Sequence, residues 1–250
     1  MYLTKIFIIH YTPLGDRKKF MDEQMKKQGI EATYILEKDR DVLTEEELKI
    51  FDTKRAANGK FPLNLAECSV ALKHFEAYKR IVEEGIEHAL ILEDDVSFLV
   101  DNFEEKMTEY FYQLPDDWDM FFVGCGWNLH IPQFVLDENP DRNVFLKGNK
   151  GTGKPEMEAT GWPICGGSTR CMDAYMITNS CAQKIVNIVD RYYKGTGKIA
   201  RPVDIWLNQQ IEHHNYNVYW GEPNLLRQGS ERGGPKDFKS SIKTCTDYKN

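Results

Sequence analysis

Residues 88–95 read His-Ala-Leu-Ile-Leu-Glu-Asp-Asp, a short apolar run that ends abruptly in acidic residues. Such a run is typical of a strand that is buried on both faces of a sheet. The preceding residues 66–84 carry apolar side chains at spacings of three and four, from Cys68 to Val82, and Gly85 follows them. This spacing predicts an amphipathic helix that ends at the glycine. A helix that leads into a buried strand is the repeating unit of an α/β fold.

The first residues of the chain also predict strands and a helix in the order of an α/β fold. Residues 3–9 are expected to form a first buried strand, and Asp16 is expected to cap a helix that ends near Gly29, before a second strand at residues 31–36. Residues 128–168 are rich in Gly, Pro, Asn and Lys, which predicts loops with one short strand. Further strands are predicted at residues 119–124, 144–146, 174–178 and 217–220, with helices after Ser180 and at residues 203–213.

Composition limits the class of protein. The chain has 250 residues with a net charge of −7, and 41% of its residues are hydrophobic, so one large or two small globular domains are expected. The surplus of acids argues against a general nucleic-acid binder. No apolar stretch approaches the ~18 residues that span a bilayer, and the N-terminal apolar run is too short for a signal peptide. We therefore expect no integral membrane segment, reduced cysteines, and a cytoplasmic location or work on the cytoplasmic face of a membrane.

The acids Glu93, Asp94 and Asp95 directly follow the predicted strand. Adjacent carboxylates repel one another unless a cation lies among them. Hard oxygen ligands suit Mg²⁺ or Mn²⁺, especially when a diphosphate completes the coordination sphere. Ligands of open α/β sheets also bind beyond the carboxyl ends of strands, where these acids are expected. The alternative interpretation is a solvated acidic turn.

Residues 89–96, Ala-Leu-Ile-Leu-Glu-Asp-Asp-Val, resemble the signature of glycosyltransferase family 25, which includes lipooligosaccharide and procollagen galactosyltransferases. Upstream, Glu67 and His74 match that family's Gly-Glu-x-Gly-Cys-x-x-Ser-His pattern, with Ser69 in place of a glycine and Lys73 in place of a serine.

Two further segments follow the family order. The opening Ile8-Ile9-His10-Tyr11 through Arg17 is similar to the family's Val-Ile-Asn-Leu…Arg, with His10 standing where Asn is usual. Downstream, Ala174-Tyr175-Met176-Ile177 is followed by Pro202-Val203-Asp204. The resemblance covers roughly residues 5–230.

The resemblance implies a GT-A-type α/β fold, a single domain whose mixed, mainly parallel central sheet is flanked by helices. Residues 1–230 would form it, with a nucleotide-binding half at 1–100 and an acceptor half at 101–230, before a polar tail at 231–250. It also implies an inverting, metal-dependent transfer of a hexose, galactose first, from a UDP-sugar to a glycan or hydroxylated protein acceptor. Mn²⁺ or Mg²⁺ would be the cofactor, and lipopolysaccharide biosynthesis would be a setting for the reaction.

Metal binding is assigned first to Asp95, with Glu93 or Asp94 directed toward ribose or a metal-bound water. His213 is a further candidate ligand, although a solvated helix end is the safer interpretation of it. Since His213 and His214 are adjacent on a helix, they diverge by ~100° and cannot both hold one ion. Inversion needs a carboxylate that takes the acceptor proton. Asp204, in the first turn of its helix, is that candidate, with Asp173 as the alternative; Asp204 could instead only favour the helix dipole.

The candidate donor-binding residues come from the first strand turn, the helix at 66–84 and the acidic triplet. Arg17 can pair with phosphate or form a surface salt bridge, and His74 can face the donor or only pack. The full set of candidate donor-binding residues is His10, Tyr11, Thr12, Arg17, Glu67, His74, Glu93 and Asp94.

Trp127 and Trp162, in Gly-rich loops, are candidates to stack on the acceptor sugar, although most tryptophans belong to cores. Two other functions remain open at this level. One is a phosphate-processing hydrolase that uses the same acids for Mg²⁺, and the other is an inactive carbohydrate-binding relative.

Overall fold

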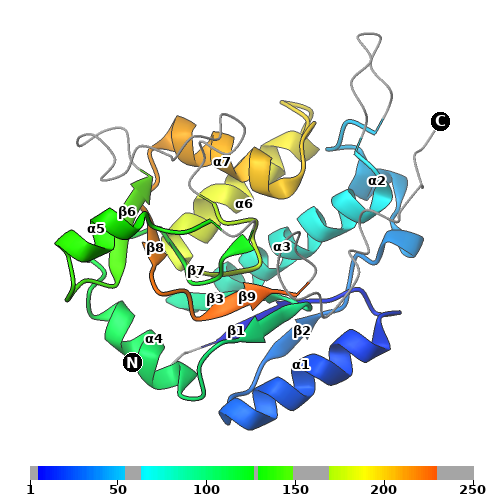
Figure 1. Ribbon diagram of the computed structural model, residues 1–250. Coiled ribbons are helices and arrows are strands. Elements are labelled where there is room, and N and C mark those ends of the chain that lie inside the picture. Colours follow the sequence, from blue (N-terminus) through cyan, green and yellow to red (C-terminus); the bar gives the residue numbers. More distant parts are fainter. Residues whose placement is uncertain (1–4, 54–62, 127–128, 149–168, 230–250) are drawn as a thin grey trace.

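The structure, a computed structural model, describes residues 5–53, 63–126, 129–148 and 169–229. Strands and helices are interspersed along this part of the chain (Figure 1). In order they are β1 (Ile6–Ile9), α1 (Gly15–Gln28), β2 (Thr33–Ile35), the 3₁₀ turn η1 (Arg40–Val42), α2 (Glu45–Leu48), α3 (Leu65–Glu83), β3 (His88–Glu93), β4 (Val96–Phe98), α4 (Phe103–Phe111), β5 (Met120–Phe122), α5 (Gln133–Glu138), β6 (Val144–Gly148), β7 (Ala174–Thr178), α6 (Asn179–Tyr193), α7 (Val203–His214), β8 (Val218–Gly221) and β9 (Leu226–Gln228).

Within the described ranges, a seven-stranded sheet has the order β2-β1-β3-β7-β5-β8-β6. β1 pairs in parallel with β2 and β3, and β5 pairs in parallel with β8, while β7 is antiparallel to both of its neighbours. β4 and β9 form a separate two-stranded ribbon. The expected α/β fold with a mixed central sheet flanked by helices is confirmed.

Helices cover both faces of the sheet, and each face has its own apolar core. Side chains that alternate along β1 divide between the cores: Phe7 and Ile9 pack with α3, α6 and α7, whereas Ile6 and Ile8 pack with α1 and α4. Figure 1 shows these two helical layers on opposite sides of the strands. A strand covered on both faces needs apolar residues at every position, which explains the unbroken apolar runs in the sequence.

One edge of the sheet gathers several chain segments. β1, β3, β5 and β8 end there, and β7 begins there because its antiparallel register places Ala174 opposite Leu92. The residue before β7, Asp173, consequently lies beside Glu93, whose N–H donates to the Asp173 carbonyl at 2.8 Å. Residues following four strands and preceding a fifth therefore meet at this carboxyl edge.

The helix ends differ in part from the sequence expectation. Asp16 does not cap α1: the helix begins at Gly15 after Leu14, and Asp16 lies in its first turn. The capping side chain of α6 is Thr178, which accepts from the N–H of Cys181, so this helix already includes Ser180. α5 lies inside the region expected to be loop. No helix of the described residues combines the length and the apolarity needed to cross a membrane.

Candidate functional site

Asp94 is held by two basic side chains from the beginning of the chain. His10, directly after β1, places Nδ1 2.7 Å from Oδ2 of Asp94, and Arg17 of α1 donates from Nη1 to Oδ1 at 2.6 Å. All three side chains are buried. Arg17 also lies 3.4 Å from Oδ2 of Asp95. Asp94 is thus a paired buried anion, and Arg17 contacts these carboxylates.

The other two acids of the triplet lie near a fourth acid that comes from β7. Asp173 is fully buried, and neither of its carboxylate oxygens has a hydrogen-bond partner among the described residues. Burial, followed by the nearby charge of Asp95, raises the pKa of Asp173 to about 8. Burial and the charges of Asp95 and Asp173 also raise the pKa of Glu93 well above its ordinary value. Glu93, Asp95 and Asp173 therefore form a cluster with too little positive charge for all three to ionise.

The backbone around Asp173 is shaped to admit this carboxylate. Cys171 and Met172 have φ values of 64° and 72°, a left-handed conformation that side chains other than glycine adopt at a cost. On the facing strand end, a Cβ on Gly124 would lie 2.3 Å from Oδ2 of Asp173. A glycine is needed at 124 because no side chain fits there. Strain of this kind is concentrated at functional sites.

His74 faces the cluster from α3. Its Nε2 lies 3.7 Å from Oε1 of Glu93, and its Nδ1 lies 2.9 Å from the hydroxyl of Tyr175, which in turn lies 2.6 Å from the hydroxyl of Tyr78. Complete burial lowers the pKa of His74 to about 3, so the imidazole is neutral. The resemblance pointed to His74, but the two tyrosines carry no local signal and emerge only from the packing of α3 on β7.

The loops after β1 and β2 are joined by a buried lysine. Lys73 places Nζ 2.8 Å from Oδ1 of Asp39 and donates to the carbonyls of residues 35, 36 and 37 at 3.4, 3.1 and 2.7 Å. Asp39 also accepts from the N–H of Thr12 at 3.3 Å. The hydroxyl of Tyr11 donates to Asp41. Tyr11 and Thr12, which directly follow His10, are thereby held at the carboxyl edge.

Glu67 and Asp204 lie together above the same edge, because α3 extends beyond the sheet. Glu67 completes a capping box with Asn64, in which each side chain accepts from the other's backbone N–H at 2.8 and 2.9 Å. Burial and the charge of Asp204 raise the pKa of Glu67, and burial raises the pKa of Asp204. Since Glu67 precedes His74 by two turns, this pair lies about 10 Å along α3 from His74.

A buried arginine that sequence analysis missed ties the ends of β5 and β8 together. Arg170 donates from Nη1 to the carbonyls of Gly124 and Gly221 at 3.0 and 2.9 Å, and from Nη2 to Glu222 at 2.6 Å. Burial alone would raise the pKa of Glu222, but the hydrogen bond with His130 and the charge of Arg170 outweigh it and lower that pKa. No periodicity or motif distinguishes Arg170, which precedes β7 in a segment of irregular structure.

Other expected site residues are not brought to this edge. His213 lies in the last turn of α7, just before β8 begins, whereas the acids lie where β8 ends. This placement corrects the expectation that His213 completes a metal site with Asp95, because the two residues lie at opposite edges of the sheet. Trp127 and Trp162 fall outside the described residues.

The acids suit a divalent cation in their chemistry. Glu93, Asp95 and Asp173 offer hard oxygen ligands, and the oxygens of Asp173 have no donor to satisfy them in the described structure. Within the described ranges, however, no three His, Cys, Asp or Glu side chains are already arranged to hold a metal ion. A cation bound here would therefore have to draw the carboxylates closer together.

Comparison with known proteins gives consistent matches. Residues 3–206 match the model of a family described as glycosyltransferase family 25 (LPS biosynthesis protein). Procollagen galactosyltransferase 2 from Mus musculus is 26% identical over 132 residues, which are 50% of this chain and 21% of that protein. The same protein from Homo sapiens is 25% identical over 132 residues, with the same shares. The chain thus spans about a fifth of the length of these curated relatives. The solved structure of mouse xyloside xylosyltransferase 1, in apo form, is 13% identical and covers 85% of this chain and 69% of its own, with a TM-score of 0.37.

Proposed function

The chain belongs to glycosyltransferase family 25, and from this premise we propose that it transfers a hexose from a UDP-sugar, with a divalent metal ion and inversion at the sugar. Galactose is the first donor sugar to test, because the matched relatives are named galactosyltransferases. A glycan or a hydroxylated protein is the proposed acceptor. The observation that carries the proposal is the cluster of Glu93, Asp95 and Asp173 at the carboxyl edge of the sheet, where α/β folds bind their ligands.

The electrostatics of this cluster favour a dication. Burying a carboxylate costs free energy, and placing several near one another costs more unless positive charge compensates. Arg17, 3.4 Å from Asp95, supplies only part of that charge. Bound Mn²⁺ or Mg²⁺ would supply that charge and would neutralise the diphosphate that leaves with the nucleotide. Glu93, Asp95 and Asp173 are the residues we propose to hold it. We propose no metal contact for Asp94, because each of its oxygens already has a partner, His10 or Arg17.

We propose that other residues at the carboxyl edge hold the acidic segment and the nucleotide-binding loops in place. Arg17 fixes Asp94 and approaches Asp95, which holds the acidic segment between β3 and β4 in place. Tyr11 and Thr12, in the loop that Lys73 and Asp39 fasten, are proposed to border the nucleotide. These contacts hold the loops before any ligand arrives, so little ordering is needed when the donor binds.

Asp204 is the proposed general base. In a single inverting displacement, a carboxylate must accept the proton of the attacking acceptor hydroxyl. Burial raises the pKa of Asp204, which makes it a stronger base than an exposed aspartate. Its neighbour Glu67 is anchored by the capping box and adds a negative charge nearby, so the proton that Asp204 accepts would be stabilised. The lone pair of the hydroxyl forms the new glycosidic bond as the bond to the diphosphate breaks.

Calorimetry of UDP binding with and without Mn²⁺ tests the donor site. We expect Mn²⁺ to tighten UDP binding at least about tenfold, and Asp173→Asn and Asp95→Asn to remove this gain. Asp101→Asn is the matched control, because Asp101 is an exposed carboxylate that pairs only with Lys27 in the described structure. Equal UDP affinity in the presence and absence of Mn²⁺ and Mg²⁺ would contradict the proposal.

A turnover assay tests the reaction. UDP release from UDP-galactose should exceed release from other UDP-sugars, and Asp204→Asn should lower kcat by about 100-fold or more while leaving UDP affinity unchanged, as for loss of a general base. Release of inorganic phosphate from diphosphates without any acceptor would instead favour a hydrolase.

A further inference from the structure

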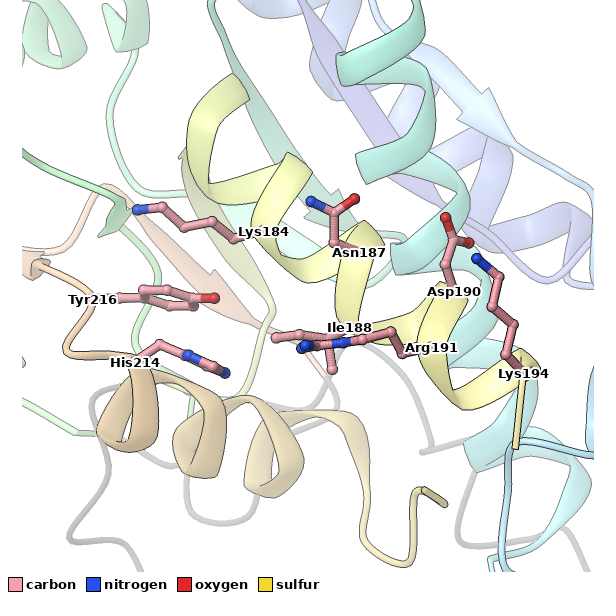
Figure 2. A pocket seen from close by; sticks show the side chains of 8 residues that line it. All are labelled: Lys184, Asn187, Ile188, Asp190, Arg191, Lys194, His214 and Tyr216. Atoms are coloured by element: carbon pink, nitrogen blue, oxygen red, sulfur yellow. The ribbon is translucent and has the colours of Figure 1, made fainter. Parts of the chain in front are cut away.

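The surface between α6 and α7 is hollowed, away from the acidic cluster. Two adjoining hollows of about 650 and 640 Å³ share Ile188, Arg191 and His214 as lining residues. Each volume falls in the range of about 300–1,000 Å³ that is usual for small-molecule sites. Figure 2 shows the first of them, with Arg191 reaching from α6 toward His214 at the end of α7.

The hollow carries positive charge in a chain whose net charge is −7. Lys184, Arg191 and Lys194 line the first hollow with a single acid, Asp190, and no acidic side chain of the described residues lines the second. Lys184 is partly compensated, since its Nζ lies 2.9 Å from Asp119. The guanidinium of Arg191, by contrast, forms no ion pair with any residue that the structure describes.

A buried hydroxyl points into the same space. Tyr216 is 1% exposed, and its hydroxyl has no hydrogen-bond partner among the described residues. Figure 2 shows this hydroxyl directed into the gap toward Ile188 and Arg191. The ring is fixed by stacking on His214, with centroids 5.7 Å apart. Because an unsatisfied buried hydroxyl costs about 1–3 kcal/mol, a side chain that keeps one at the wall of a hollow indicates a missing acceptor.

We propose that this hollow, here called the α6–α7 site, binds a phosphate-bearing small molecule, with Arg191 and the hydroxyl of Tyr216 donating to the phosphate oxygens. Arginine is the side chain best suited to a phosphate, because its planar fork can donate two hydrogen bonds at once. Gln209 and Gln210, which line the second hollow, offer amide groups to neutral polar parts of the same ligand. The site is separate from the proposed donor site.

His214 lines both hollows, and its pKa depends on the charges around them. Partial burial, then the positive groups His213, Arg191 and Lys184, lowers the pKa of His214. The acids near these groups include Asp190, which lines the first hollow, Asp119, which pairs with Lys184, and Glu212, which precedes His213 on α7. A bound phosphate would reverse this effect, so the pKa of His214 is expected to rise on binding.

Binding of glucose 6-phosphate, inorganic phosphate and glucose to the full chain tests the α6–α7 site. Calorimetry should show saturable binding of the two phosphates and none of glucose. Arg191→Gln should weaken binding of glucose 6-phosphate at least about tenfold, and Tyr216→Phe by about five- to tenfold, as for loss of a hydrogen bond to a charged group. Lys26→Gln removes an exposed charge from α1, on the other face of the sheet, and is expected to leave binding unchanged.

A stability measurement separates a binding role from a structural one. If the hydroxyl of Tyr216 serves only a ligand, Tyr216→Phe should leave the Tm of the unliganded chain unchanged or raise it, because the phenylalanine has no unsatisfied group to bury. Phosphate should raise the Tm of the unaltered chain and of Lys26→Gln but not of Arg191→Gln. Phosphate binding that is equally tight in Arg191→Gln and Tyr216→Phe would overturn the proposal, as would the absence of saturable phosphate binding.

Discussion

Replacement of Asp173 by asparagine should flatten the pH dependence of stability in the metal-free protein. In the folded chain the pKa of Asp173 is raised to about 8 by burial and by Asp95, whereas the unfolded chain titrates near the ordinary value of 3.8. Between these two values the folded state holds a proton that the unfolded state has lost. Because the native state then binds more protons, the free energy of unfolding falls as the pH rises through this window.

The size of the effect follows from the same shift. Each pH unit inside the window changes the free energy of unfolding by about 1.4 kcal/mol per proton. Between pH 5 and pH 8 the wild-type chain should therefore lose up to about 4 kcal/mol through Asp173 alone. The amide that Asp173→Asn introduces cannot ionise and has nearly the same shape as the carboxyl group, so the variant should escape this loss. Glu93 contributes in the same direction, and without Asp173 its own pKa should fall toward the ordinary value.

Urea unfolding at pH 5, 6, 7 and 8, with a chelator present, measures the effect. The difference in unfolding free energy between Asp173→Asn and the wild type should grow steadily with pH. Asp101→Asn serves as the control, because the pKa of this exposed carboxyl is lowered rather than raised by the hydrogen bond and charge of Lys27. If the curves for Asp173→Asn and the wild type run parallel from pH 5 to pH 8, the buried acid does not hold its proton and the reasoning fails.

Three further substitutions test the supports of the site, each by urea unfolding. Lys73→Met should cost about 3 kcal/mol, because its carbonyl and carboxylate partners lose their donor; a cost near zero would show that the loops after β1 and β2 do not depend on it. Gly124→Ala should cost about 2 kcal/mol from overpacking against Asp173, and adding Asp173→Ala should recover most of that loss. Arg170→Met should cost about 3–5 kcal/mol, because buried Glu222 loses its arginine and keeps only the contacts with His130 and the N–H of Ile131; simultaneous Glu222→Gln should restore part of this loss if the charge is the cause.

Local sequence patterns located most of the elements that build the sheet. The run at 88–92 became β3, the strand expected at 174–178 became β7 with the same bounds, and the periodicity over 66–84 became α3 within a residue at each end. The misses have local causes as well. The helix was expected to begin after Ser180, whereas Thr178 caps it and it begins at Asn179; α5 was hidden by the Pro- and Asn-rich composition around it.

The residues of the candidate site that adjoin a strand end could be placed from the local sequence, whereas those on helices, such as His74, were identified by the family resemblance. Glu93, Asp94 and Asp95 follow an apolar run, so their position at the carboxyl edge could be inferred from the chain alone. That Asp173 lies beside Glu93 could not be inferred from the chain alone, since Asp173 precedes a strand and has no motif of its own. The same holds for Arg170, whose partners come from two segments that are distant in sequence, Gly124 and Gly221–Glu222.

Short-range order in the chain was enough to specify an α/β fold with an acidic strand end, because hydrophobic period and helix capping act between neighbouring residues. Which of the acids is paired with a basic side chain depended on long-range packing. Folding brings His10 and Arg17 onto Asp94 and neutralises it, while the antiparallel register of β7 brings Asp173 next to Glu93 without a counter-charge. Charge interactions act through space and depend on burial, so which carboxylate is satisfied and which stays available emerged only when the strands were paired.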